Sequence, residues 1–243
     1  MLKIKNLSYT YNDGTKALKN INVDLKNGNI IGLIGGNGSG KTTLFKNILG
    51  IHYPTEGCIY LKNYLIKNNK KDKNKLMESI GIIFQDPEQQ IFSSNVYDDI
   101  AFGLRNKNFD EKKIQKKVKS VIKTVKIEDI VNKPVHFLSH GQKKRVALAG
   151  MLALDKDILL LDEPTAGLDP EMTNDLINII KDLSQNGKKV IISSHNMDLI
   201  YSITDYCYVL SNAEIIDSDK TKKVFKNKDK LKKAGLAQPY MLR

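Results

Sequence analysis

The chain has 243 residues, of which 41% are hydrophobic and 27% are charged, and it carries a formal net charge of +12. These proportions are ordinary for a globular protein, and the length is enough to bury a substantial core in one domain or two small ones. No apolar run approaches the roughly 18–20 residues of a membrane-spanning helix, and residues 1–6 do not resemble a secretory signal. We therefore expect any membrane contact to go through another protein or the membrane surface.

Lysine carries almost all of the positive charge. Only three arginines occur, Arg105, Arg145 and Arg243, and many lysines fall in polar stretches. A basic chain can bind nucleic acid or anionic lipid, but this distribution, with abundant Asn and Ile, indicates a compositional bias, and we expect no nucleic-acid partner. Cys58 and Cys207 lie outside any metal-type spacing and are expected to be reduced thiols.

The first third of the chain alternates strands with loops around one helix. Ile21, Val23 and Leu25 alternate with polar residues, the period of a half-buried strand, whereas residues 30–34 are apolar throughout, as in a strand buried on both faces. The elements predicted before residue 90 are strands at 2–7, 19–25, 30–34, 58–61 and 80–84, a helix from about Lys41 to Gly50, and an exposed loop in the lysine-rich stretch 67–75.

From about residue 96 to 153 the patterns become helical. Asp110 is a plausible N-cap, Pro134 interrupts, and a new helix opens at Ser139. One apolar helix face is formed by Ile114, Val118, Val121, Ile122 and Val125. Strands are then predicted at 157–162, 188–194 and 205–210, and helices at 170–184 and 196–203. Repeated strand–helix units predict an α/β fold with a mainly parallel sheet and a helical insertion.

A phosphate-binding loop follows the buried strand at 30–34 and opens a helix. Its residues are Gly35, Gly36, Asn37, Gly38, Ser39, Gly40, Lys41, Thr42 and Thr43. Glycines let backbone N–H groups curl around phosphate oxygens at a helix N-terminus. Lys41 is expected to reach the outer phosphates of a nucleotide, and the Thr42 hydroxyl to ligate Mg²⁺.

Two acids follow the apolar strand that ends at Leu161. Open parallel sheets bind ligands at the carboxyl ends of their strands, which is where Asp162 and Glu163 emerge. Asp162 is expected to hold Mg²⁺, directly or through water. Glu163 is then positioned to orient and deprotonate the water that attacks the nucleotide.

With these motifs in order, the chain resembles the ATPase subunits of ABC transporters over nearly all of its length. The five-residue stretch Leu138, Ser139, His140, Gly141 and Gln142, which lies 97 residues after Lys41, is similar to the family signature. The resemblance implies that Ser139, Gly141 and the start of their helix face the γ-phosphate of ATP held by a second chain. His140 departs from the common pattern, which has glycine there, so a side chain needs room near the dimer interface.

Four further positions match the family in the expected order. The resemblance implies that Gln85 contacts Mg²⁺ and the attacking water, and that His195 touches the γ-phosphate. It further implies that Asp169 belongs to a loop along the dimer interface, and that Tyr11 stacks on adenine, with Tyr9 as the alternative. The implied domain spans residues 1–220, with an antiparallel β part near the N-terminus and a helical subdomain at about 88–154; residues 221–243 form a short helical tail.

Three stretches resemble the energy-coupling-factor subgroup, which imports cobalt, nickel or vitamins: residues 11–18, 84–92 and 141–150. This predicts an ATPase, with ATP and Mg²⁺, that pairs as a homodimer or with a related ATPase and works at the cytoplasmic face of the membrane through membrane-embedded subunits. Residues 85–92 and 96–100 are expected to line the groove for such a subunit, with Asp98 and Asp99 attracting a basic helix. Another ABC importer or exporter, and a nucleic-acid-associated ABC ATPase, remain alternatives.

Overall fold

The computed structural model describes residues 1–243 and contains two sheets. The larger sheet has six strands, five of them parallel, with one antiparallel strand at its edge. In sheet order its strands are β10 (Glu214–Lys220), β9 (Tyr206–Ser211), β3 (Ile30–Ile34), β8 (Lys189–Ser193), β7 (Ile158–Asp162) and β6 (Ile80–Ile83). The prediction of an α/β fold with a mainly parallel sheet is therefore confirmed. The antiparallel edge strand β10 was not predicted.

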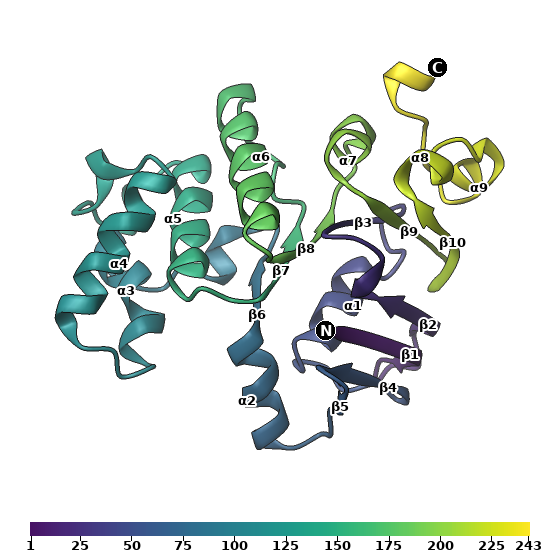
Figure 1. Cartoon of the computed structure of the whole chain (residues 1–243), viewed down its shortest axis with the longest axis horizontal. Helices are drawn as coiled ribbons and strands as arrows, with labels where there is room; N and C mark the ends of the chain where they lie inside the picture. Colours follow the sequence, from purple (N-terminus) through teal and green to yellow (C-terminus); the bar gives the residue numbers. More distant parts are fainter.

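The smaller sheet is antiparallel and lies near the N-terminus of the chain (Figure 1). In sheet order its strands are β2 (Lys16–Asp24), β1 (Leu2–Thr10), β4 (Glu56–Leu61) and β5 (Tyr64–Leu65). Helix α1 (Lys41–Ile48) contributes Leu44, Phe45 and Ile48 to one buried cluster, which also holds residues of this sheet and one face of the larger sheet. The helix is therefore packed in the core that the two sheets share.

Alternation along the buried strands divides the apolar residues between two clusters. Ile31, Leu33 and Leu160 pack toward α1 and the antiparallel sheet, whereas their neighbours Leu159 and Leu161 pack toward the helices of the opposite face. Successive side chains of a strand point to opposite faces. Both faces are covered, which explains why these strands are apolar throughout.

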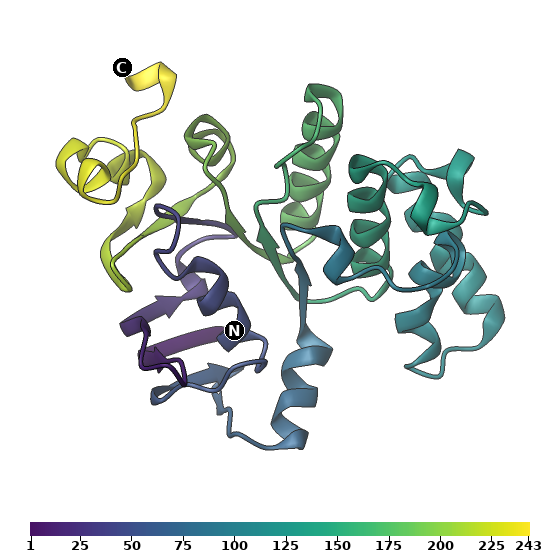
Figure 2. The ribbon, with the colours of Figure 1, turned by 180° about the vertical axis from the view of Figure 1, so that it is seen from behind.

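Three helices gather at one side of the molecule, beyond α6 and β6 (Figure 1). They are α3 (Val96–Arg105), α4 (Glu111–Thr124) and α5 (His140–Ala153). Asp110 caps α4 by accepting from the backbone N–H of Lys113, and Ile114, Val118 and Ile122 are buried on its inner face. Seen from behind, the same three helices lie at the opposite end of the molecule from the C-terminus (Figure 2).

The expectation of an exposed loop at residues 67–75 is wrong, because most of that stretch belongs to helix α2 (Lys70–Ser79). The Asn69 side chain caps the helix by accepting from the backbone N–H of Asp72, and Asp72 and Leu76 are buried against the core. Lys70 and Lys71 are exposed, whereas Lys73 and Lys75 are half-buried. The segment is helical because it has a polar N-cap and a buried face. Its many lysines favoured the prediction of an exposed loop.

The remaining helices follow the last strands. They are α6 (Pro170–Gln185), α7 (Met197–Ile203), α8 (Thr221–Val224) and α9 (Lys228–Lys233), and short 3₁₀ turns lie at Leu25–Asn27, Pro87–Gln89, Glu128–Ile130, Val135–Phe137 and Tyr240–Leu242. None of the helices has the length and apolar character that crossing a bilayer requires. Both cysteines are free thiols.

Candidate active site

The loop between β3 and α1 has the backbone shape of an anion cradle. Gly38 and Gly40 have φ of +72° and +110°, in the left-handed region that glycine tolerates. A Cβ added at Gly40 would lie 2.6 Å from the carbonyl oxygen of Ala17, and one at Gly35 would lie 2.2 Å from that of Leu210. Gly40 is therefore required both by its conformation and by the close approach of neighbouring backbone, Gly38 by its conformation, and Gly35 by the close approach.

Lys41 crosses this loop. Its Nζ atom donates to the carbonyl oxygens of Gly35 at 2.8 Å and Gly36 at 3.0 Å. Burial lowers the pKa of Lys41 from its ordinary value, and the carboxylates of Glu163 and Asp162 oppose that shift. The ammonium group is thus held at the mouth of the cradle, where it can meet the outer phosphates of a nucleotide.

The side chains at the end of β7 join the loop through oxygen atoms. The Thr42 hydroxyl donates to Oδ2 of Asp162 at 2.7 Å, and the Ser193 hydroxyl donates to Oδ1 of the same carboxylate at 2.5 Å. No group of three or more His, Cys, Asp or Glu side chains is arranged to hold a metal ion by itself. A hydroxyl and one carboxylate suit Mg²⁺, which prefers oxygen ligands and usually completes its shell with water and substrate phosphates.

Glu163 follows Asp162 with a strained backbone. Its φ of +47° is unusual for a residue other than glycine, and its backbone N–H donates to the carbonyl and hydroxyl oxygens of Ser193. The carboxylate accepts from the backbone N–H of His195 at 3.2 Å through Oε2. The other oxygen, Oε1, lies 3.2 Å from His195 Nε2 and is hydrogen-bonded only when that nitrogen carries a proton.

Most of the residues predicted to bind nucleotide line one open cavity of about 450 Å³. These are Tyr11, Asn37, Gly38, Ser39, Gly40, Lys41, Thr42, Thr43, Gln85, Asp162, Glu163 and His195. Sequence reasoning missed Thr15, Lys16 and Ala17 as site residues; they line the same cavity from the end of the β1–β2 turn and the start of β2. The resemblance of residues 11–18 to the energy-coupling-factor subgroup included them, but nothing in their residue types indicated a place in the site.

The structure separates the two candidate adenine-stacking tyrosines. Tyr11 lines the cavity and its hydroxyl lies 3.0 Å from the Thr43 hydroxyl. Tyr9 stacks instead on His52, with ring centroids 4.8 Å apart and planes at 14°, and meets Tyr11 edge-on. Tyr11 is therefore the ring available at the cavity, and Tyr9 supports it from behind.

The five-residue signature stretch lies outside this cavity. Ser139 caps α5 by accepting from the backbone N–H of Gln142, whose side chain accepts in turn from the Ser139 N–H. Gly141 is buried, and a Cβ there would lie 2.9 Å from Met172 Sδ. Leu138 is buried as well, whereas Ser139 is exposed. Ser139 is therefore accessible at the surface of the chain, and its contact with a second chain stays a prediction.

His140 belongs to the signature stretch and Gln85 to the nucleotide cavity. Both line a second cavity of about 360 Å³, together with Thr42, Asp162 and Gly167. A Cβ on Gly167 would lie 3.3 Å from His140 Cδ2, so the imidazole packs on this glycine. Asp169, two residues later, caps α6 by accepting from the backbone N–H of Met172 at 2.7 Å and is exposed. The position that departs from the common signature therefore has room in this chain.

A strand–loop–helix phosphate cradle, paired acids at the end of the neighbouring strand and a separate helical unit define a phosphate-loop nucleotide hydrolase. The family model described as ABC transporter matches residues 18–166. The chain belongs to the ABC transporter family and is an ATPase of that family.

Relatives and solved structures agree with this assignment along the whole chain. A putative ABC transporter ATP-binding protein of Listeria monocytogenes is 49% identical over 100% of this chain and 91% of its own length. The energy-coupling factor transporter ATP-binding protein EcfA2 of Clostridium perfringens is 42% identical over 98% of this chain and 84% of its own.

Among solved structures, cbiO1 of C. perfringens, described as part of the ABC transporter complex cbiONQ, has a TM-score of 0.84 at 42% identity and covers 96% of this chain and 93% of its own. The dimeric cassette MJ0796 bound to ADP and phosphate also has a TM-score of 0.84, at 28% identity over 91% and 99% of the two chains.

Proposed function

We propose that this ATPase pairs with a second ATPase chain and drives an energy-coupling-factor importer of cobalt ions, nickel ions or a vitamin. The observation that carries the proposal is similarity over nearly the full chain to proteins named energy-coupling factor ATP-binding proteins. The stretches at 11–18, 84–92 and 141–150, which resemble that subgroup, agree with this similarity.

In the proposed mechanism, Lys41 binds the outer phosphates of ATP, and Tyr11 stacks on its adenine. Thr42, Asp162 and Gln85 would hold Mg²⁺, which, when bound, neutralises charge on the phosphate oxygens. Glu163 accepts a proton from the attacking water through its buried carboxylate, and His195 lies within 3.2 Å of that carboxylate. The Ser139 end of α5 completes the site of the opposite chain by offering N–H donors to the γ-phosphate.

A groove between the core and the three-helix unit is the proposed seat of a membrane-embedded subunit. It has a volume of about 420 Å³, and its rim carries exposed apolar side chains, Ile51, Met77, Phe92 and Phe102. Phe92 and Phe102 meet edge-on with centroids 4.4 Å apart. Exposed apolar clusters of this kind mark interaction sites. The groove is lined by Gln90 and Phe92, which follow Gln85 of the nucleotide cavity by five and seven residues, so nucleotide binding and docking can be coupled mechanically.

The two acids expected to attract a basic helix have partners within the chain. Asp98 accepts from Arg105 at 2.8 Å, and Asp99 accepts from the backbone N–H groups of Phe92 and Ser93. Asp99 lines the groove, so its role in docking stays a prediction. Its replacement would also disturb the turn that carries Phe92, and the aromatic residues are therefore the cleaner test.

The proposal is tested by co-purifying the tagged chain from membranes and identifying its partners by mass. We expect a multi-helix membrane protein and either a second copy of the chain or a related ATPase. Uptake of labelled cobalt, nickel and vitamins by cells with and without the chain would identify the cargo. Recovery with an unrelated permease would favour another ABC importer or exporter, and recovery with ribosomes or nucleic acid would contradict a transport role.

A further inference from the structure

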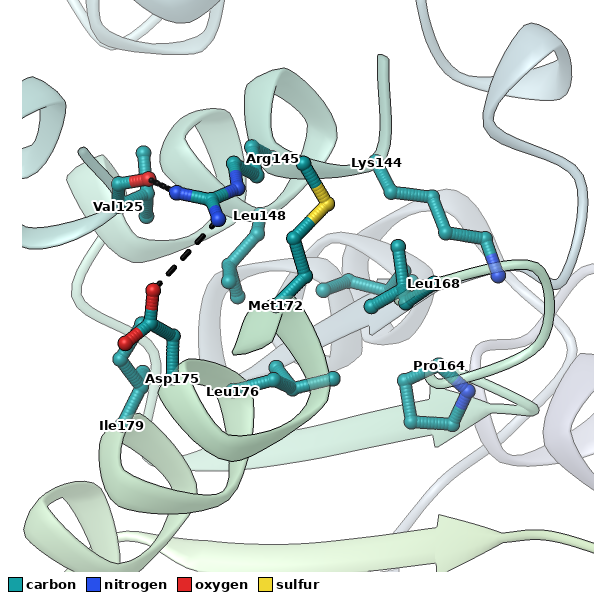
Figure 3. A pocket seen from close by; sticks show the side chains of 11 residues that line it. Val125, Lys144, Arg145, Leu148, Pro164, Leu168, Met172, Asp175, Leu176 and Ile179 are labelled. Carbon is teal, nitrogen blue, oxygen red and sulfur yellow. Dashed lines mark hydrogen bonds and ion pairs between the residues drawn. The ribbon is translucent and has the colours of Figure 1, made fainter. Parts of the chain in front are cut away.

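Two neighbouring cations of α5 attach the signature helix to the core of the same chain. In Figure 3, Lys144 extends toward the loop that carries Pro164 and Leu168, while Arg145 turns to the other side. Arg145 donates to the carbonyl oxygen of Val125 at 2.9 Å and pairs with Asp175 of α6 at 3.5 Å. Arg145 therefore joins α5 to α4 and α6, and Lys144 reaches the active-site segment.

Lys144 is a buried ammonium group that meets backbone and no carboxylate. Its side chain donates to the carbonyl oxygens of Glu163 at 3.3 Å and Ala166 at 2.5 Å, and the residue is 4% exposed. Burial lowers the pKa of Lys144, opposed by the charges of Glu163 and Asp86. Burying a charge without a paired carboxylate costs free energy. Lys144 therefore does not form a stabilising ion pair, and its burial requires another explanation.

One carbonyl oxygen to which Lys144 donates belongs to the strained residue Glu163. Ser193 of β8 holds the Glu163 N–H, and Lys144 of α5 holds the Glu163 carbonyl oxygen. With φ at +47°, the residue sits in a conformation that persists only where its surroundings impose it. The direction of the Glu163 carboxylate is therefore set from one side by the sheet and from the other by the signature helix.

We infer that Lys144 is a positioning residue that ties the signature helix to Glu163 of the same chain and holds that carboxylate in line with the attacking water. The inference rests on the proposed role of Glu163 as the base. It adds a route within one chain by which movement of the three-helix unit alters hydrolysis, separate from the signature's contact with the opposite chain.

Lys144→Met tests the inference, because methionine keeps the length of the side chain and removes its donors. We expect kcat for ATP hydrolysis to fall about 10–100-fold, the scale on which small misplacements of a reacting group act, while KM for ATP changes less than about threefold. Lys144→Arg should recover part of kcat. Lys189→Met is the matched control, since Lys189 also donates from a partly buried position to a backbone carbonyl, that of Gly28, and lines neither of the two active-site cavities; its kcat should match the wild type.

The same change in a Glu163→Gln background separates the two proposals. There Lys144→Met should cause no further loss of the residual hydrolysis, and the ATP-bound dimer should form as in Glu163→Gln alone. Equal kcat in Lys144→Met and wild type, with Glu163→Gln inactive, would overturn the role of Lys144 and leave that of Glu163 standing. Loss of the dimer in the double variant would also overturn it, because Lys144 would then act on pairing. Substantial turnover by Glu163→Gln would instead show that Glu163 is not the general base, and the inference would fail with it.

Lys144→Gln is made in parallel, because an aliphatic side chain at this site could prevent folding. It keeps an N–H donor and removes the buried charge. We expect an intermediate kcat with an unchanged KM; a wild-type kcat in this variant, with no partial effect, would contradict the inference even if the methionine variant cannot be purified.

Discussion

Thr42 and Asp162, 120 residues apart in the chain, are joined by a hydrogen bond of 2.7 Å from the threonine hydroxyl to the carboxylate. The contact brings the start of α1 to the end of β7, and both groups are oxygen ligands of the kind that Mg²⁺ takes. Thr42→Val keeps the shape of the side chain and removes the hydroxyl. We expect hydrolysis to need a severalfold higher Mg²⁺ concentration for half-maximal rate, measured by phosphate release over a Mg²⁺ titration. An unchanged Mg²⁺ requirement would remove Thr42 from the metal site.

Glu163→Gln replaces the proposed base with a group of the same shape that cannot accept the proton. General-base catalysis contributes about 10²–10⁴ in rate, so kcat should fall by that factor while ATP binding persists. Size-exclusion chromatography with ATP should then show a trapped dimer. If the variant hydrolyses ATP at near wild-type rate, another group takes the proton.

Lys41→Ala should weaken nucleotide binding, because it removes a cation from the phosphates and leaves every proton acceptor in place. A hydrogen bond to a charged group contributes about 1.5–3 kcal/mol, which corresponds to roughly 10–150-fold in the dissociation constant. Isothermal titration calorimetry with ATP measures this. Lys46→Ala, on the same helix but outside the cavity, serves as the control and should bind as the wild type does; equal affinity in both variants would contradict the assignment of the loop.

Lys156 makes the free energy of unfolding of the chain depend on pH. It is buried and donates to the carbonyl oxygen of Met77, and burial lowers its pKa to about 8. Between pH 8 and 10.5 the unfolded chain keeps the proton that the folded chain has lost, so the free energy of unfolding rises with pH in that window. We expect denaturant titrations at several pH values to show that, in this window, the free energy of unfolding of the wild type rises with pH relative to that of Lys156→Met. Parallel curves would show that Lys156 titrates alike in both states.

Phe92 and Phe102 test the groove. Replacing both with serine removes exposed apolar surface without changing charge, so recovery of membrane-embedded partners should fall at least about tenfold, while the ATP titration curve of the isolated subunit stays the same. Tyr240→Ser is the control, because Tyr240 is 78% exposed and lies on the C-terminal tail. Full recovery of the complex from the double variant would place the docking surface elsewhere.

Local sequence was sufficient for the parts of the fold in which chemistry and periodicity agree. The loop from Gly35 to Thr42 could be predicted because glycines with positive φ and a helix start have few alternatives. The apolar run of β7 required a buried strand, which in a parallel sheet places Asp162 and Glu163 at the ligand edge. The pairing of these two motifs therefore predicts that the loop and the acids lie together, and in the structure the Thr42 hydroxyl donates to Asp162.

Other features depended on contacts between distant segments. Helix α2 forms because Leu76 finds a core and Asn69 caps its start, and neither is visible in a run of lysines. Strand β10 pairs with β9 at an edge, and its residues alternate too weakly to predict it. Tyr11 rather than Tyr9 lines the cavity, because Tyr9 packs on His52 from a distant segment of the chain, and the stacking of Tyr11 on adenine stays a prediction.

Lys144 shows the same division most clearly. Lys144 lies two residues after the signature, within the stretch 141–150 that resembles the subgroup, and nothing in the sequence assigns it a contact. Only the packing of α5 against the loop after β7 carries its ammonium to the carbonyl of Glu163. The sequence determines which chemical groups are present and how strands and helices alternate. The tertiary structure determines which of those groups become buried and contact one another, because burial and contact depend on surfaces contributed by segments far apart in the chain.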